Sequence, residues 1–292
     1  MPKIAVIGPG AIGGTLASFL LENPQNTASI CARTPFEKLE ITANSQTLTH
    51  PVTVHTHSSS TTLVDWIVLA TKTYQVPQAA NWFERLSGHG TRIAVVQNGV
   101  EHLANLTPYF PVERIVPVII DCPAERKSHG QIIRHGDVRI DVPNTPESAD
   151  FATLFDDPAV TVNLTDDWST AAWRKLCINA AGAISALVNQ PANIAADPRA
   201  ADIMKNLIQE CIAVGRAEGA TLDETIIQTV VSGAAAAPDG SMNSLHADLV
   251  AHRPMEWDAR NGVIARLGKK HRIPTPYNEL TAHLLSLLES KP

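Results

Sequence analysis

The feature that most constrains this 292-residue chain is a glycine-rich turn near its start, with the sequence GPGAIG at residues 8–13. The turn directly follows an apolar run, Lys3–Ile7, of the kind expected for a parallel strand that is covered on both faces. Apolar residues then recur at helical spacing until Asn23-Pro24, which predicts a strand–turn–helix unit. In this setting the G-x-G-x-x-G spacing is typical of a dinucleotide-binding turn.

Each glycine of this turn has its own physical role. Gly8 permits the tight turn, Gly10 lets a pyrophosphate approach the backbone, and Gly13 lets the helix and the strand pack closely. The first helical N–H groups, at Ala11 and Ile12, face the same anion and are helped by the helix dipole. We therefore predict that these five residues bind a dinucleotide cofactor.

The end of the second predicted strand, Ala28–Ala32, distinguishes NAD from NADP. A NAD site has an acidic side chain there, which accepts the ribose hydroxyl. This chain has Arg33 at that point and no carboxylate before Glu37. A guanidinium can hold a 2′-phosphate through charge-assisted hydrogen bonds, although a solvated surface arginine is the alternative. The pattern favours NADP(H).

The remaining pattern indicates the fold class. Buried runs at 66–70 and 93–96 alternate with helical stretches, which predicts βαβ units in a doubly wound sheet. Short β-rich pieces over 114–162 are expected to form the outer, partly antiparallel part of the same sheet, and the pattern after them is helical. The expected α/β fold is a Rossmann-type doubly wound sheet followed by an all-helical C-terminal domain. We expect residues 1–165 to form the NADP-binding domain and residues 166–292 the helical substrate and catalytic domain.

Charge and cysteine content narrow the function classes. The chain has 23 Lys and Arg against 29 Asp and Glu, a formal net charge of -6, whereas nucleic-acid binders normally carry clustered positive charge. No apolar run approaches the roughly 20 residues that span a bilayer. Its four cysteines lie far apart without metal-ligand spacing, as expected of free thiols in a reducing compartment. We therefore expect a cytoplasmic enzyme without a nucleic-acid, membrane or metal partner.

Polar residues follow two of the predicted strands, at the edge where open α/β sheets bind ligands. Lys72 and Gln75 come after the run at 66–70, and Asn98 comes after the run at 93–96. Either group alone would be interpreted as a surface lysine or an ordinary turn. Both, however, lie where the nicotinamide half of the cofactor is expected. We interpret Lys72, Gln75 and Asn98 as candidate residues of the cofactor site.

Lys175 and Asn179 lie four residues apart, so they share one face of a predicted helix. The helix is otherwise apolar and rich in alanine, and both side chains are therefore expected to be partly buried or to face a cleft. An unpaired buried ammonium is costly, and a desolvated lysine gives up its proton readily, which suits a proton donor. An interdomain salt bridge is the alternative. Further on, Glu256 lies near a predicted helix start, where the dipole favours a carboxylate whatever its function.

These segments together resemble the ketopantoate reductase (2-dehydropantoate 2-reductase) family over essentially the full chain. The segments that carry the resemblance are GPGAIGG, TKTYQ, QNGV, WRKLCINAAGAISAL and, most specifically, RPMEWDARNGVIARLGKKHRIPTPYNEL. The resemblance implies a Rossmann domain and a helical domain, with NADPH and a small-molecule 2-keto acid bound in the cleft between them. It also implies a role in pantothenate biosynthesis, with 2-dehydropantoate reduced to pantoate.

The resemblance further implies a role for each site residue. Lys175 matches the general acid that gives a proton while NADPH gives the hydride, and Asn179 matches a substrate-contacting asparagine. Ser244 matches a serine that helps to hold the substrate carboxylate, and Glu256 matches the glutamate at its hydroxyl end. The implied catalytic residues are Lys175, Asn98 and Glu256; the implied substrate-binding residues are Asn179, Ser244, Asn98 and Glu256; the implied cofactor-binding residues are Gly8, Gly10, Ala11, Ile12, Gly13, Arg33, Lys72, Gln75 and Asn98.

One departure from the family pattern bears on the substrate. Family members that make pantoate usually carry a second asparagine one helical turn after the first, whereas Gly182 and Ala183 occupy that region here. Two alternatives therefore stay open: a related NADP-dependent 2-keto acid or hydroxyacid dehydrogenase with another substrate, and a non-catalytic NADP(H) sensor. The oligomeric state, a homodimer included, and the roles of His246, His252 and Trp257 also stay open.

Overall fold

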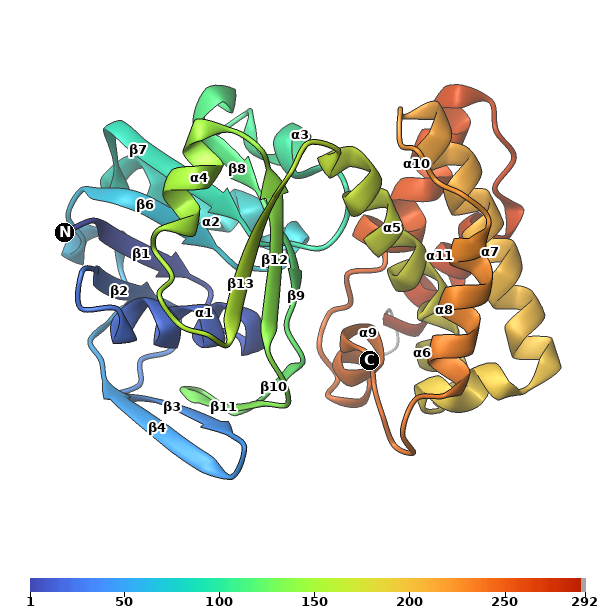
Figure 1. Ribbon diagram of the computed structural model, residues 1–292, viewed down its shortest axis with the longest axis horizontal. Coiled ribbons are helices and arrows are strands. Elements are labelled where there is room, and N and C mark those ends of the chain that lie inside the picture. Colours follow the sequence, from blue (N-terminus) through green and yellow to red (C-terminus); the bar gives the residue numbers. More distant parts are fainter. Residues whose placement is uncertain (290–292) are drawn as a thin grey trace. The chain divides into compact units, whose positions relative to one another are not determined.

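The computed structural model describes residues 1–289, and these form two compact units (Figure 1). The first unit comprises residues 1–97 and 101–168. The second comprises residues 98–100 and the described chain from Ser169 onward. The division thus lies close to residue 165, where the sequence pattern changes. The assignment of the tripeptide 98–100 to the second unit has no counterpart in the sequence analysis.

A six-stranded parallel sheet forms the centre of the first unit. Its strands lie side by side in the order β5-β2-β1-β6-β7-β8, and every neighbouring pair is parallel. Numbered along the chain, these six strands have the order 3-2-1-4-5-6 of dinucleotide-binding folds, which confirms the predicted Rossmann-type sheet. Their bounds are β1 (Lys3–Ile7), β2 (Thr27–Cys31), β5 (Val54–His55), β6 (Val64–Leu69), β7 (Ser87–Val95) and β8 (Ile115–Pro117).

The central strand β1 is apolar and buried after its first residue, Lys3, because both of its faces are covered. Ile4 and Val6 pack into one core cluster with α1 (Ala11–Glu22), whereas Ala5 and Ile7 pack into a second cluster with α2 (Val76–Leu86). Successive side chains of a strand point to opposite faces, so a strand between two covered faces needs a continuous apolar run. This is the run that the sequence pattern singles out. The unit also contains the short helices α3 (His102–Leu106) and α4 (Pro146–Ala152).

A β-hairpin lies between β2 and β5. Its strands, β3 (Lys38–Ala43) and β4 (Gln46–Pro51), pair antiparallel through a turn at Asn44 and Ser45, whose φ angles are 49° and 64°. Asparagine tolerates such positive φ angles in tight hairpin turns. β4 is mostly exposed, so it lacks the apolar run of a buried strand. The hairpin belongs to a four-stranded sheet with β11 (Gln131–Arg134) and β10 (Ala124–Ser128).

The segment 114–162 does not extend the main sheet as expected. Of its described strands, β8 alone belongs to the six-stranded parallel sheet, so the expectation is wrong for the others. β8 ends at Pro117, which has no N–H group to donate to a further strand, although the next residue, Val118, still donates its N–H to the carbonyl oxygen of Val95 in β7 at 3.0 Å. The chain then enters a separate three-stranded sheet, in which β12 pairs antiparallel with β9 and parallel with β13 (Figure 1). The strands of this sheet are β9 (Ile119–Asp121), β12 (Val138–Pro143) and β13 (Val160–Thr165).

The second unit is helical, as predicted. Its core surrounds α7, whose buried Leu207, Ile208 and Cys211 pack in one cluster with Trp173 of α5. α7 begins where the Asp197 side chain accepts a hydrogen bond from a backbone N–H, as helix caps commonly do. No helix within residues 1–289 is long and apolar enough to cross a membrane. The helices are α5 (Trp168–Ala181), α6 (Ala183–Val188), α7 (Pro198–Ala217), α8 (Thr225–Ala235), α9 (Ser244–Val250), α10 (Val263–His271) and α11 (Pro276–Glu289).

A buried histidine lies at the start of α3 in the first unit. The side chain of His102 is 3% exposed, and its Nε2 lies 2.8 Å from the carbonyl oxygen of Gln97. Its ring packs edge-on against Trp168, with 5.4 Å between the ring centroids. Burial lowers the pKa of His102 from 6.5 to about 4. The folded protein therefore keeps this ring neutral at pH values where an exposed histidine is charged.

We expect His102 to make the protein less stable in acid. Between pH 6.5 and 4 the unfolded chain binds a proton at this residue that the folded chain does not, so the free energy of unfolding falls as the pH falls. The full loss corresponds to about 3 kcal/mol. Urea unfolding at pH 7 and pH 4.5 should show a smaller acid loss in His102→Gln than in the wild type. Substitution of the exposed His283 by Gln is the control, and equal acid losses in all three proteins would contradict this expectation.

Candidate functional site

The glycine turn connects β1 to α1, and its backbone needs glycine at two positions. Gly8 has a φ of 89° and donates its N–H to the carbonyl oxygen of Cys31 at 3.1 Å. A Cβ on Gly13 would lie 2.2 Å from the carbonyl oxygen of Gly8. Any larger residue at Gly13 would therefore push the helix away from the strand. The turn and the helix are held together as the sequence pattern predicts.

The open side of this turn fits a pyrophosphate group. A Cβ on Gly10 would meet nothing within 4 Å, so the backbone there can be approached closely. No side chain among the described residues caps the N-terminus of the 12-residue helix α1. The N–H groups of Ala11 and Ile12 belong to the first turn, where a helix has no acceptor of its own. Exposed backbone donors and the positive end of a helix dipole together suit the phosphates of a dinucleotide.

The other predicted cofactor residues follow strands next to β1. Arg33 is exposed just beyond the end of β2, and Lys72 is half-buried beyond the end of β6. Oε1 of Gln75 accepts a hydrogen bond from the Lys72 N–H at 3.2 Å, which closes the turn into α2. Because β2, β1 and β6 are neighbours in the sheet, Arg33, the glycine turn and Lys72 lie along one edge. This edge is where the strand order reverses and where open α/β sheets bind ligands.

Gln97 connects two loops at this edge and is absent from the sequence predictions. Its side chain is 8% exposed, and Nε2 donates to the carbonyl oxygen of Thr71 at 3.0 Å. His102 holds the backbone carbonyl of Gln97 from the other side. These contacts fix the loop after β7 to the loop after β6. A glutamine before an Asn-Gly turn carries no sequence signal for such a role, because the partner lies 26 residues away.

In the second unit, three predicted residues from distant parts of the sequence meet in a hydrogen-bonded chain. Nδ2 of Asn179 donates to Oδ1 of Asn98 at 3.3 Å, and Nδ2 of Asn98 donates to Oε2 of Glu256 at 3.0 Å. Glu256 is 4% exposed. The two asparagines are thereby oriented, since each amide oxygen and nitrogen has a fixed direction. The arrangement can present amide and carboxylate groups to a polar ligand.

Gly99 makes the contact between Asn98 and Glu256 possible. Its φ is 99°, and a Cβ at this position would lie 2.8 Å from the carbonyl oxygen of Ala259. The tripeptide therefore packs closely on the π-helical turn η5 (Asp258–Gly262), which begins two residues after Glu256. π-helical turns are rare and occur frequently at functional sites. Asn-Gly pairs are common in ordinary turns, so the sequence carries no signal for this role.

Lys175 and Asn179 lie one turn apart on α5, and both are half-buried, as expected. The end of this helix is fixed by the fully buried Asn261, whose Nδ2 donates to the carbonyl oxygen of Ala180 at 3.2 Å. The same nitrogen donates to Oδ1 of Asn278 on α11 at 3.0 Å. Asn261 therefore links η5 to α5 and α11. This link sets the position of Glu256 relative to the helix that carries Asn179.

The helix breaks at Gly182, in the region where the chain departs from the family pattern. α5 ends at Ala181 and α6 begins at Ala183. Nδ2 of Asn243 donates to the carbonyl oxygen of Gly182 at 2.7 Å, and a Cβ on Gly182 would lie 3.0 Å from the same nitrogen. The side-chain amide of Asn243 thus lies beside Gly182, which has no side chain of its own. Asn243 also caps α9 by accepting two backbone N–H groups.

Ser244, the exposed first residue of α9, contacts an arginine that the sequence analysis did not select. Nη2 of Arg260 donates to Oγ of Ser244 at 2.7 Å. Arg260 lies in η5 and is 2% exposed, and burial lowers its pKa, while the negative charges of Glu256 and Asp248 oppose this lowering. An arginine near a predicted helix start is ordinarily solvated, so the sequence carried no signal for a buried guanidinium.

Of the three residues whose roles the sequence leaves open, His246 and Trp257 make side-chain hydrogen bonds. Nε2 of the buried His246 lies 3.0 Å from Oδ1 of Asn189, and burial lowers the pKa of His246. Nε1 of Trp257 donates to Oε2 of Glu289 at 2.6 Å. His252 is exposed and has a φ of 50°. These contacts belong to the packing of the second unit.

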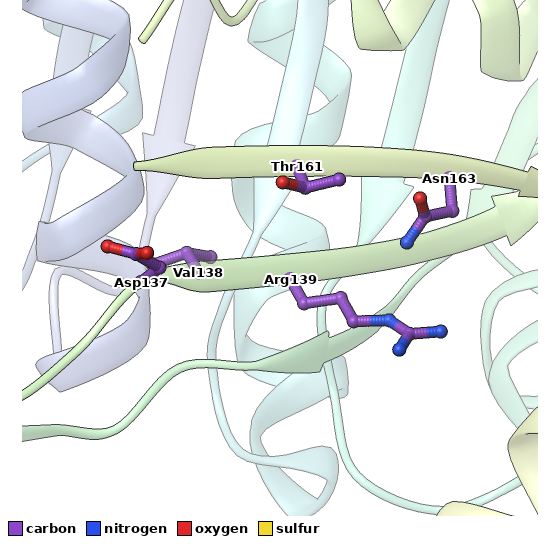
Figure 2. A pocket seen from close by; sticks show the side chains of 5 residues that line it. All are labelled: Asp137, Val138, Arg139, Thr161 and Asn163. Atoms are coloured by element: carbon purple, nitrogen blue, oxygen red, sulfur yellow. The ribbon is translucent and has the colours of Figure 1, made fainter. Parts of the chain in front are cut away.

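A shallow hollow of about 320 Å³ lies on β12 and β13 in the first unit. Figure 2 shows the five side chains that line it, and they come from these two neighbouring strands and the residue before β12. None of them is a predicted site residue, and the three-stranded sheet that carries them is separate from the sheet that carries the glycine turn. Within residues 1–289, no group of three or more His, Cys, Asp or Glu side chains could hold a metal ion.

Family models and known proteins match this chain over both units. The family model described as "Ketopantoate reductase PanE/ApbA" matches residues 4–147, and "Ketopantoate reductase PanE/ApbA C terminal" matches residues 167–289. A Caulobacter vibrioides protein named 2-dehydropantoate 2-reductase is 45% identical over 286 residues, which cover 98% of this chain and 99% of the relative. A Mycobacterium tuberculosis protein of the same name is 36% identical over 291 residues, which cover 99% and 98%.

Solved structures with the same fold carry more than one activity in their names. A 2-dehydropantoate 2-reductase from Geobacter metallireducens has a TM-score of 0.91 at 24% identity, covering 98% of this chain and 99% of that one. D-mandelate dehydrogenase with NADH and anilino(oxo)acetate has a TM-score of 0.87 at 21% identity, covering 98% of each chain. A dimeric ketopantoate reductase from Staphylococcus aureus has a TM-score of 0.88 at 23% identity, covering 98% of each chain. At these identities the likeness establishes the fold.

We expect Gly99→Ala to destabilise the protein by about 1–3 kcal/mol, because alanine is strained at this φ and its Cβ meets the Ala259 carbonyl. Urea unfolding at pH 7 measures the loss. Gly233→Ala is the matched control, since Gly233 lies inside α8 with nothing within 4 Å of an added Cβ. The control should gain roughly 0.5–1 kcal/mol. A Gly99→Ala protein as stable as the wild type would contradict the close approach.

Proposed function

The chain belongs to the ketopantoate reductase family, and from this membership we propose that it reduces 2-dehydropantoate (ketopantoate) to pantoate. The family consists of NADP-dependent oxidoreductases. The observation that carries the proposal is the hydrogen-bonded chain from Asn179 through Asn98 to Glu256, with Lys175 one helical turn from Asn179. These groups supply a proton donor, two oriented amides and a buried carboxylate within one unit. That set suits a substrate with a carbonyl, a carboxylate and a hydroxyl.

The first unit has residues that fit NADP(H). The glycine turn and the first N–H groups of α1 would hold the pyrophosphate, and Arg33 would hold the 2′-phosphate. Lys72 and Gln75 lie on the neighbouring loop, where Gln75 closes the turn. When bound, NADPH supplies the hydride that reduces the substrate carbonyl.

Lys175 is the proposed proton donor. As the carbonyl carbon is reduced, its oxygen gains negative charge, and the Lys175 ammonium stabilises that charge and gives a proton from Nζ. The carbonyl becomes a hydroxyl, and the lysine is left neutral until it takes a proton again. Asn179 and Asn98 orient the substrate through their amides. Glu256 accepts a hydrogen bond from the hydroxyl end of the substrate.

A specific observation favours a second candidate, a dehydrogenase of the same family acting on a different 2-keto acid. The region of Gly182 lacks the second asparagine of pantoate-forming members, and Asn243 supplies an amide there from another direction. This change alters polar contacts without affecting Lys175. A non-catalytic sensor is less well supported, because it has no need for Lys175, Asn179 and Glu256 together. NADPH oxidation with ketopantoate and with shorter and bulkier 2-keto acids separates the three functions.

We expect Lys175→Ala to lower kcat by about 10²–10⁴, the usual contribution of general-acid assistance. NADPH binding, measured by fluorescence titration, should change little, because the residues proposed for the cofactor phosphates lie in the first unit. Lys205→Ala is the matched control, since Lys205 is exposed on α7. Unchanged turnover in Lys175→Ala would remove this residue from the mechanism.

We expect Arg33→Ala to weaken the preference for NADPH over NADH. Loss of a charge-assisted hydrogen bond, about 1.5–3 kcal/mol, should raise the KM for NADPH roughly tenfold or more and leave the KM for NADH nearly unchanged. Steady-state kinetics with both cofactors measure the change. Equal effects on both cofactors would show that Arg33 does not contact the 2′-phosphate.

A further inference from the structure

A buried guanidinium lies directly behind Ser244 in the second unit. Arg260 is 2% exposed, and its Nη2 donates to Oγ of Ser244 at 2.7 Å. Its Nε has no hydrogen-bond partner among the described residues. Burying a charged group without satisfying all of its donors is costly, so such an arginine calls for an explanation.

The geometry gives Ser244 a particular direction as a donor. Because its oxygen accepts a hydrogen bond from Arg260, its own hydroxyl hydrogen is left for an acceptor outside the protein. Ser244 is exposed, whereas Arg260 is not. A hydroxyl polarised by a buried cation is a stronger donor than an ordinary serine. Ser244 is therefore the exposed member of a hydrogen-bonded pair whose buried member is the positively charged Arg260.

The surroundings keep the guanidinium in place and charged. Arg260 lies in the turn η5, which Asn261 fixes to α5 and Gly99 contacts through the carbonyl of Ala259. The carboxylate of Asp248 pairs with Arg253, with 3.0 Å between Oδ1 and Nε. Burial lowers the pKa of Arg260, and the negative charges of Glu256 and Asp248 oppose this lowering. The guanidinium of Arg260 is thus held in place by neighbouring residues, and it contacts Ser244, which is exposed.

We propose that Arg260 is a positioning residue that makes the enzyme specific for substrates with a free carboxylate, acting through the hydroxyl of Ser244. The inference rests on the proposed reduction of a 2-keto acid. A carboxylate accepts a hydrogen bond from the polarised hydroxyl and is attracted by the nearby positive charge. A neutral ester of the same keto acid lacks the charge and gains much less from both effects.

The test compares a 2-keto acid with its own methyl ester. We expect Arg260→Met to lower the ratio of kcat/KM for ketopantoate to kcat/KM for its methyl ester by about tenfold to a hundredfold, as for loss of a charged hydrogen bond. Arg260→Lys, which keeps the charge, should recover part of the ratio. The kcat/KM for the ester should stay within about threefold of the wild type. Arg272→Met, which removes an exposed guanidinium just after α10, is the matched control.

A double-mutant cycle tests whether Arg260 acts through Ser244. Ser244→Ala alone should lower the acid-to-ester ratio, and Arg260→Met should then change it little further. Additive effects, an unchanged ratio in Arg260→Met, or a parallel loss with acid and ester would each overturn the proposal. If Arg260→Met does not fold, an unchanged ratio in both Ser244→Ala and Arg260→Lys overturns it.

Failure of the proposed role of Arg260 can be distinguished from failure of the proposed function. If none of the tested 2-keto acids supports NADPH oxidation by the wild type, the proposed function fails. Calorimetric titration of pantoate with NADP⁺ present then still tests Arg260. Binding at least tenfold weaker in Arg260→Met than in the wild type supports the proposal, and equal binding overturns it.

Discussion

The close approach of Gly99 to the carbonyl of Ala259 is the contact on which the site in the second unit depends. It requires a residue without a Cβ and with a positive φ, and it carries the preceding Asn98 to Glu256. Asn98 follows a strand of the parallel sheet in sequence but belongs to the helical unit in space. The contact of Gly99 with Ala259 thereby brings Asn98, from the first half of the chain, to Asn179 and Glu256, from the second half.

A second constraint is the set of hydrogen bonds that buried side chains of η5 make to other elements. Asn261 bonds the end of α5 and the start of α11, and Arg260 bonds Ser244. Each of these side chains would be costly to bury without a partner. Their partners therefore fix η5, α5, α9 and α11 relative to one another within the unit. Rigid placement of this kind is what a site needs when it must orient a small substrate.

The parts of the fold with a strong local signal could be predicted. The run at β1, the turn with Gly8 and Gly13, and the helical pattern of the C-terminal half reflect periodicity and backbone conformation, which act over a few residues. The exposed strand β4 was missed because it has no apolar face. The segment after Pro117 was assigned to the wrong sheet, because strand pairing depends on contacts distant in sequence. Arg260 and Gln97 were missed because their partners are also distant in sequence. Arginine and glutamine are common at the surface, so the residue types gave no signal of burial.

The sequence by itself determined the class of fold, the glycine turn after β1 and the family, because each depends on residue types at fixed short spacings. Tertiary structure alone decided which polar groups meet. Asn98, Asn179 and Glu256 are separated by 81 and 158 residues along their two contacts, and no local pattern records such a meeting. The same holds for the burial of Arg260 behind Ser244. Burial and partner choice arise from how helices pack, and packing is a property of the whole folded unit.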